Sequence, residues 1–377
     1  MPLKHWMQLA LAEGVGAVLR RRIVEKAGCV EAACEAPRSL LATVEGIGPA
    51  GAARIAQAIQ TAAERAEREL IRASAAGVRV VCTEDEDFPA LLREIPDPPA
   101  VLYFRGSLQP RDLHSIAIVG SRKCSVYGRE QAERFGALLA GAGLTVVSGG
   151  ARGVDSAAHR GAMRPENGRT IAVLGCGVDI AYPPENAPLF EQITARGAIL
   201  SEHPLGTPPV AENFPRRNRL ISGLARGVLV IEADLRSGAL ITARQAGEEQ
   251  GRAVFALPGR VDNPNSAGPH RLIREGATLV SSLEDILENL GPLPQSVHEP
   301  ALFDAPTGAD ASPEQCPSSL TESQQKLVDA LVSEELDANG IIEATGLPAA
   351  TVLRELTLLT LRGVIRKVDS TRYARRA

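Results

Sequence analysis

Apolar residues follow two different patterns along this chain. In residues 1–75 they recur at helical spacing, whereas residues 78–290 contain short continuous apolar runs separated by segments of helical length. Strands are expected at Ile116–Val119, Leu144–Ser148, Thr170–Leu174, Ala198–Ser201, Gly227–Glu232, Ala253–Ala256 and Thr278–Val280. Helices are expected at Gly128–Ala142, Asp155–Met163, Glu185–Ala195, Phe214–Ala225 and Ala239–Gly251. Because buried parallel strands give continuous apolar runs, this alternation predicts an α/β fold with a doubly wound sheet.

The N-terminal region contains two related turns, each with a glycine on either side of an apolar residue. They are Gly14-Val15-Gly16 and Gly46-Ile47-Gly48, and they precede helices expected at Arg20–Ala27 and Ala52–Ala73. This is the pattern of a helix-hairpin-helix, in which glycines let backbone amides approach a DNA phosphate closely. Helical hairpins that only reverse the chain or bind protein use the same pattern, so both roles stay open for residues 1–77.

The C-terminal part of the chain changes character twice. Residues 291–320 contain six prolines and no periodicity, which is typical of a linker. Short helices are then expected at Thr321–Glu334, Leu336–Thr345 and Ala349–Arg362, followed by two strands, at 363–368 and 372–374. Three helices with a two-stranded wing predict a winged-helix domain at 321–377, after a core domain at 78–290.

Composition and charge limit the functions that fit. The chain has 377 residues, 44% hydrophobic and 23% charged, as in globular proteins, and a net charge of -4, so any nucleic-acid surface must be local. Its six cysteines form no CxxC pair and no cluster with histidine, so we expect reduced thiols and no metal. No run approaches the ~18–20 apolar residues of a membrane span, and no signal-peptide core is present. A cytoplasmic protein without membrane association is expected.

Small and basic residues follow the first two of these strands, where each strand ends. Gly120-Ser121-Arg122 comes after the first strand and does not fit the GxGxxG pattern, which disfavours a dinucleotide cofactor. The hydroxyl and guanidinium of this loop suit a phosphate oxygen instead. Ser148-Gly149-Gly150 comes after the second strand, where small residues before a helix let main-chain amides surround an anion.

Basic residues also open the helix expected at Phe214–Ala225. Pro215 favours a helix start, where free N–H groups and the positive dipole end attract an anion. Arg216, Arg217, Asn218 and Arg219 follow it, and Ser237-Gly238 begins another helix after a later strand. The carboxyl ends of parallel strands meet at one sheet edge, so these loops predict a site for a phosphate-bearing ligand. A metal nuclease would need a compact carboxylate cluster, and none is spaced convincingly.

Taken together, the motifs resemble the DNA processing protein A family (DprA, also called Smf) over most of residues 80–290. The matching strings are Gly120-Ser121-Arg122, Ser148–Asp155, Phe214-Pro215-x-Arg217-Asn218-Arg219 and Ser237–Thr242. The resemblance implies an extended Rossmann-like domain, with a helix-hairpin-helix or SAM-like domain before it and a winged helix after it. It further implies a homodimer that binds single-stranded DNA without hydrolysing it and without a cofactor. Such a protein hands incoming DNA to the RecA recombinase during natural transformation.

The DNA-binding residues expected from the loops and the resemblance are Gly120, Ser121, Arg122, Ser148, Gly149, Gly150, Arg216, Arg217, Asn218, Arg219, Ser237 and Gly238. Arginines there would hold phosphates without selecting a sequence. Phe214 and Tyr182 are the local candidates for base stacking. No catalytic residue is assigned. Two alternatives use the same loops: a nucleotide phosphoribohydrolase-like enzyme, disfavoured because Gln245 stands where that family has a glutamate, and a sensor of a small nucleotide.

Overall fold

The computed structural model describes residues 2–290 and, after them, 322–331, 336–347 and parts of 351–375. The chain divides into two compact units, residues 1–302 and 303–377. The expected linker at 291–320 lies outside the described residues. The domain boundaries expected at 77 and 320 therefore stay predictions.

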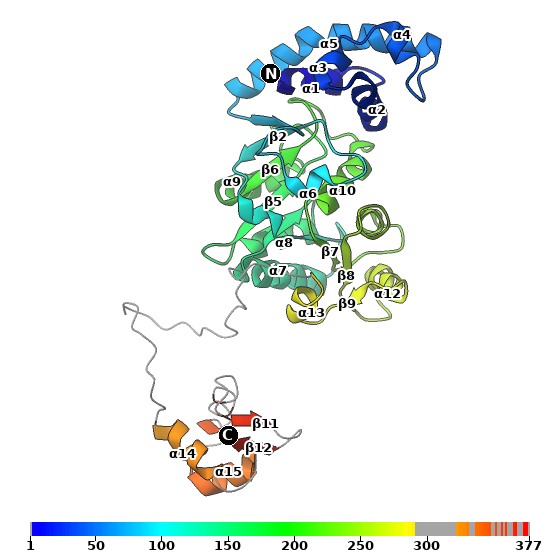
Figure 1. Ribbon diagram of the computed structural model, residues 1–377. Coiled ribbons are helices and arrows are strands. Elements are labelled where there is room, and N and C mark those ends of the chain that lie inside the picture. The colour runs from blue at the N-terminus through cyan, green and yellow to red at the C-terminus, as the bar shows by residue number, and fades with distance from the viewer. Residues whose placement is uncertain are drawn as a thin grey trace. The chain divides into compact units, whose positions relative to one another are not determined.

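A nine-stranded sheet forms the centre of the first unit, in the order β1-β2-β6-β5-β4-β3-β7-β8-β9 (Figure 1). Its strands are β1 (Arg79–Cys82), β2 (Val101–Gly106), β3 (Ser115–Val119), β4 (Thr145–Ser148), β5 (Arg169–Val173), β6 (Ala198–Ser201), β7 (Gly227–Val230), β8 (Ala253–Ala256) and β9 (Thr278–Leu279). Strands β3 to β9 are parallel, and β1 and β2 add antiparallel pairs at one edge. The expected α/β fold is confirmed, and the sequence interpretation missed only β1 and β2 of this sheet.

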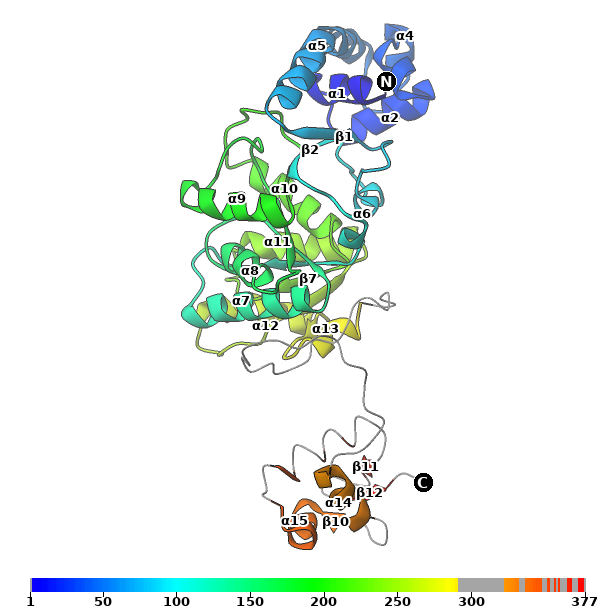
Figure 2. The same cartoon turned by 90° about the vertical axis from the view of Figure 1, so that its left-hand side faces the viewer.

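Helices cover both faces of this sheet because its strands are apolar on both sides. One face packs against α7 (Val126–Gly141), α8 (Val154–Ala162), α9 (Ala187–Arg196) and α13 (Glu284–Leu287), and α7 and α8 lie side by side in both views (Figures 1 and 2). The other face packs against α6 (Ala90–Arg93), α10 (Asn213–Gly223), α11 (Gly238–Arg244) and α12 (Ala267–Arg274). The helix expected to continue to Gly251 instead passes from α11 into a π-helical turn, η3 (Gln245–Glu249).

Five helices precede the sheet and build a core of their own. They are α1 (Pro2–Leu11), α2 (Ala17–Ala27), α3 (Val30–Cys34), α4 (Arg38–Leu41) and α5 (Pro49–Ala75). Gly16 and Gly48 stand at the N-caps of α2 and α5, and Gly14 and Gly46 have positive φ angles of 79° and 89°. The two glycine turns thus start helices as expected. Helices α1 and α5 also contact the sheet edge at β1.

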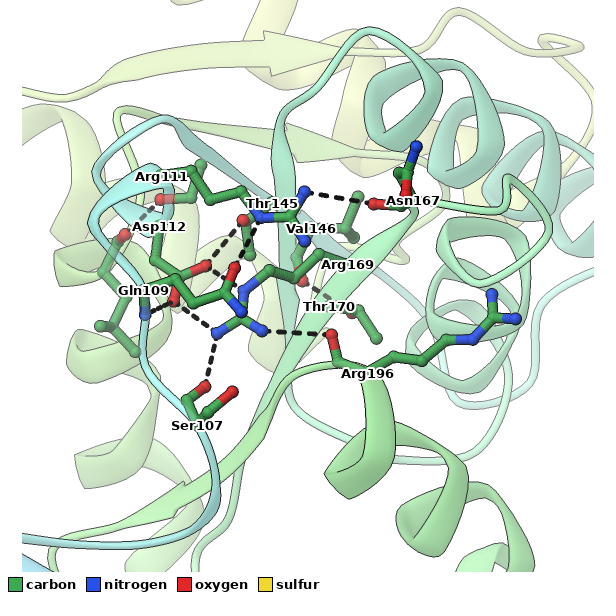
Figure 3. Close-up of polar contacts among 12 residues, drawn as sticks. Ser107, Gln109, Arg111, Asp112, Thr145, Val146, Asn167, Arg169, Thr170 and Arg196 are labelled. Atoms are coloured by element: carbon green, nitrogen blue, oxygen red, sulfur yellow. Dashed lines mark hydrogen bonds and ion pairs between the residues drawn. The ribbon is translucent and has the colours of Figure 1, made fainter.

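A buried ion pair joins the segment between β2 and β3 to the amino ends of β4 and β5 (Figure 3). Arg169, the first residue of β5, is 2% exposed, and its Nε and Nη2 donate to the Asp112 carboxylate at 2.5 and 2.7 Å. The same guanidinium donates to the backbone carbonyls of Ser107 and Arg196, and the Thr145 hydroxyl donates to Asp112. This network lies at the edge of the sheet opposite the loops that carry the expected site, so its role is structural.

The second unit contains a small sheet in the order β10-β12-β11 and the helices α14 (Glu322–Ala330) and α15 (Ala338–Thr345). Its strands are β10 (Leu336–Asp337), β11 (Ile365–Lys367) and β12 (Arg372–Arg375). The expectation that a helix begins at Leu336 was wrong, because Leu336 and Asp337 pair with β12 and Asp337 then caps α15. The wing strands are confirmed, with this third strand added. No helix in the described parts of either unit combines the length and apolar character that a membrane span requires.

Candidate nucleic-acid interface

A cleft of about 750 Å³ opens at the carboxyl ends of the parallel strands. The strand order reverses between β3 and β7, since the chain moves toward β4 on one side and toward β8 on the other. Such a switch point leaves a crevice between the two diverging loops, where ligands of doubly wound sheets bind. The loops after β3 and β7 line this cleft, together with residues from α10, α11 and the loop after β8.

The loop after β3 supplies two solvent-exposed cationic side chains. Arg122 and Lys123 are exposed and line the cleft, and neither has an ion-pair partner within residues 2–290. The Arg122 guanidinium lies 5.2 Å from the centre of the Phe214 ring, which in turn lies 5.6 Å from the Tyr182 ring. The cleft therefore combines positive charge with a pair of aromatic faces, and that combination suits a phosphate chain carrying bases.

The glycines after β4 bring two loops into close contact. Gly153 has a φ of +76°, and a Cβ on it would lie 2.4 Å from the Ser121 carbonyl oxygen. Gly150 has a φ of +66°, and its Cβ would lie 2.7 Å from the Phe190 ring. These glycines shape the backbone beside the cleft. The Ser148 hydroxyl points into the sheet instead, where it donates to the Ile118 carbonyl at 2.6 Å.

Arg217 lies beneath the cleft and not on its open rim. Its side chain is buried and donates to the carbonyl oxygens of Gly149, at 2.7 Å, and Val173. Burial lowers the pKa of Arg217 to about 10, so the guanidinium stays charged at neutral pH. Asp155 is also buried here, and burial raises its carboxyl pKa while the nearby Arg217 opposes the shift. A buried guanidinium, with one carboxylate close by, therefore forms the floor of the cleft.

The structure separates the other two arginines of the α10 motif from the cleft. Arg219 is buried and forms ion pairs with Asp97, at 2.8 Å, and with Glu202. Arg216 is exposed, but it does not line the cleft. Of the basic residues expected on α10, Arg217 alone is among the cleft-lining residues.

The remaining expected residues come from α10, the start of α11 and the loop after β3. Asn218 donates from its amide to the Gly238 carbonyl at 3.3 Å, and Ser237 caps α11. Gly120 and Ser121 line the cleft, and the Ser121 hydroxyl accepts a hydrogen bond from the Lys123 amide. Seven of the twelve expected residues thus meet at one cleft, namely Gly120, Ser121, Arg122, Arg217, Asn218, Ser237 and Gly238. Gly149 and Gly150 lie beside it, while Ser148, Arg216 and Arg219 do not reach it.

Sequence reasoning missed Lys123, Asp234 and Asn265, which also line the cleft. Lys123 could have been found, because it follows Arg122 in the same loop. Asn265 could not, since it lies five residues beyond Gly259-Arg260, the glycine and basic signal of its loop. Within the residues that the structure describes, no group of three or more His, Cys, Asp or Glu side chains could hold a metal ion.

Comparison with known proteins shows the family. The model of the DNA recombination-mediator protein A family matches residues 79–291, and that of the DprA winged helix domain matches residues 311–369. The chain belongs to the DprA/Smf family. It is 35% identical over 402 residues to protein Smf of Synechocystis, covering 99% of this chain and 98% of that one. The winged-helix assignment at the C-terminus, expected from the helix and wing pattern, is thereby confirmed.

Two solved structures of DprA proteins resemble the chain. That of DprA from Streptococcus pneumoniae superimposes with a TM-score of 0.65 at 34% identity, covering 76% of this chain and 97% of that one. That of DprA from Helicobacter pylori, described for its single-stranded DNA binding mode, gives a TM-score of 0.50 at 30% identity, covering 56% and 95%.

Proposed function

We propose that this protein binds single-stranded DNA in the cleft between β3 and β7. The observation that carries the proposal is a pair of exposed cations, Arg122 and Lys123, which are unpaired within residues 2–290 and share their cleft with the Phe214 and Tyr182 rings. Membership of the DprA/Smf family and the single-stranded DNA binding of the Helicobacter pylori relative support it.

Phosphates would contact the guanidinium and ammonium groups, and bases would stack on the aromatic faces. Both kinds of contact are largely independent of base sequence. The buried Arg217 would add a fixed positive charge beneath the strand without touching it. We assign the protein a binding role and no bond-breaking step. The bound strand would serve DNA processing in natural transformation, and we propose that a homodimer passes it to the RecA recombinase.

An anisotropy titration with labelled oligo-dT tests the binding site. Replacing Arg122 and Lys123 together by alanine should lower affinity and reduce the slope of log K against log salt by about 1.4, at ~0.7 per lost phosphate contact. Arg134→Ala, on the exposed face of α7, removes a similar charge away from the cleft and should leave the slope unchanged. Wild-type affinity in the double variant would place the DNA elsewhere.

Two further measurements test the finer parts of the proposal. Light scattering of the purified chain should give twice the monomer mass, and RecA loading on oligo-dT coated with single-strand binding protein should accelerate when the chain is added. Monomer mass, or an unchanged loading rate, would remove the corresponding partner. Incubation with nucleoside monophosphates should release no base; a release that Arg122→Ala abolishes would favour the phosphoribohydrolase-like alternative.

A further inference from the structure

One buried carboxylate ties together the loops beneath the cleft. Glu232 follows β7 and is 2% exposed. Its carboxylate accepts hydrogen bonds from the Ser125 amide at 2.8 Å, the Ser125 hydroxyl at 2.6 Å and the Asn263 amide group at 3.2 Å. Its backbone carbonyl accepts the Ser121 amide at 2.6 Å. Glu232 thus holds the loop after β3 at two places and the loop after β8 at one.

These hydrogen bonds lie on either side, in sequence, of the two solvent-exposed cationic side chains of the cleft. Ser121 precedes Arg122, and Ser125 follows Lys123 by two residues, so both ends of the cationic segment are fixed to Glu232. The Ser125 hydroxyl also accepts the Gly128 amide at 3.0 Å and thereby caps α7. Glu232 itself does not line the cleft, so it contacts the cationic loop from behind.

Gly128 shows how tightly the carboxylate is enclosed. A Cβ at this position would lie 2.4 Å from the Glu232 Oε2 and 2.5 Å from its Cδ. Gly128 is helical, so alanine suits its backbone, and the three atoms nearest to a Cβ there all belong to the Glu232 side chain. Gly128→Ala should therefore push the Glu232 side chain out of its position without changing residue 232 itself.

Burying a carboxylate is costly unless donors surround it, and an apolar residue would fill the same space at lower cost. What the carboxylate adds is a fixed geometry for the loop. A binding site whose cations are held in place before the ligand arrives loses less conformational entropy on binding. We propose that Glu232 is a positioning residue for DNA binding, which holds Arg122 and Lys123 in the orientation that receives phosphates. The inference rests on the proposed function.

Glu232→Gln separates this role from simple electrostatics. The amide has one acceptor oxygen and a donor group that faces Ser125 or Asn263, so at least one of the three hydrogen bonds is lost. The net charge rises by one, which by itself strengthens attraction to a polyanion. Positioning predicts the opposite: affinity for oligo-dT should fall about tenfold, and the salt slope should fall by ~0.7. Glu130→Gln makes the same charge change at an exposed position on α7 and should cause no loss of affinity.

A double-mutant cycle with the Arg122→Ala/Lys123→Ala variant completes the test. If Glu232 acts through the cationic loop, adding Glu232→Gln to that variant should weaken binding no further. Gly128→Ala should lower affinity as Glu232→Gln does. If Glu232→Gln does not fold, Ser125→Ala, which removes the hydroxyl's bond to Glu232 together with its cap on α7, takes its place in the cycle with the same predicted sign.

The outcomes separate the two proposals. Unchanged affinity in Arg122→Ala would refute the proposed function itself. Weakened binding in Arg122→Ala, with wild-type affinity in Glu232→Gln and Gly128→Ala, would overturn the positioning role alone. Strictly additive losses in the cycle would also overturn it, because they would show that Glu232 acts on the fold at large.

Discussion

Acidification should destabilise this protein through one buried histidine. His159 on α8 is fully buried, and its Nδ1 lies 2.7 Å from the Thr170 hydroxyl. That hydroxyl donates to the Val146 carbonyl, so Nδ1 must donate to Thr170, and Nε2 has no partner among the residues that the structure describes. Burial, with smaller contributions from the charges of Arg160 and Arg217, lowers the pKa of His159 to about 3. The folded state therefore keeps this imidazole neutral.

The sign and size of the effect follow from the two pKa values. The unfolded chain binds a proton on His159 below its ordinary pKa of 6.5, whereas the folded state does so only near 3. Stability from this residue is thus complete above pH 6.5 and is lost progressively as the pH falls toward 3. At pH 5 the loss is about 2 kcal/mol, because each pH unit between the two values costs about 1.36 kcal/mol.

Thermal unfolding followed by circular dichroism at pH 7.5 and pH 5.0 measures this loss. His159→Leu removes the titrating group and keeps the site filled, and comparing the two proteins cancels the other groups that titrate in this range. The wild-type melting temperature should fall on acidification by on the order of 3–5 °C more than that of the variant. Equal falls would refute the assignment of a neutral, buried His159.

The structure supports three further predictions. Arg169→Ala leaves the largely buried Asp112 carboxylate without its ion-pair partner, so the free energy of unfolding should drop by about 3–5 kcal/mol, measured by urea titration. Arg217→Ala should also destabilise the fold, by about 2–4 kcal/mol, because two buried carbonyls lose their donor; a variant that melts at the wild-type temperature would show that this arginine is not structural. Gly153→Ala forces a side chain into a positive φ and against the Ser121 carbonyl, so we expect a loss of about 1–3 kcal/mol together with weaker oligo-dT binding, and unchanged values of both would contradict the packing described.

The sequence interpretation found most of the parallel part of the sheet because its central strands are buried on both faces. Six of its seven strands lie in the centre, where continuous apolar runs such as Ile116–Val119 leave little ambiguity. It missed β1, whose four residues Arg79–Cys82 are exposed at one end and buried at the other. An edge strand that pairs with a neighbour on one side only has a weak apolar pattern, and its antiparallel pairing depends on contacts distant in sequence.

The sequence predicted the location of the candidate site better than it predicted which residues line it. Loops after parallel strands must meet at one edge, so Gly120, Ser121 and Arg122 could be placed near Ser237. The role of Arg219 could not be inferred, because its partner Asp97 lies 122 positions earlier in the chain. Charge in a motif shows that an anion is near, but only the fold decides whether that anion is a ligand or a carboxylate of the protein.

A crystal structure of the protein with an oligo-dT strand would test the central claim most directly. We predict that a phosphate lies within hydrogen-bonding distance of the Arg122 guanidinium, with a thymine against the Phe214 ring. A strand ordered along another surface, with the cleft between β3 and β7 left empty, would contradict it.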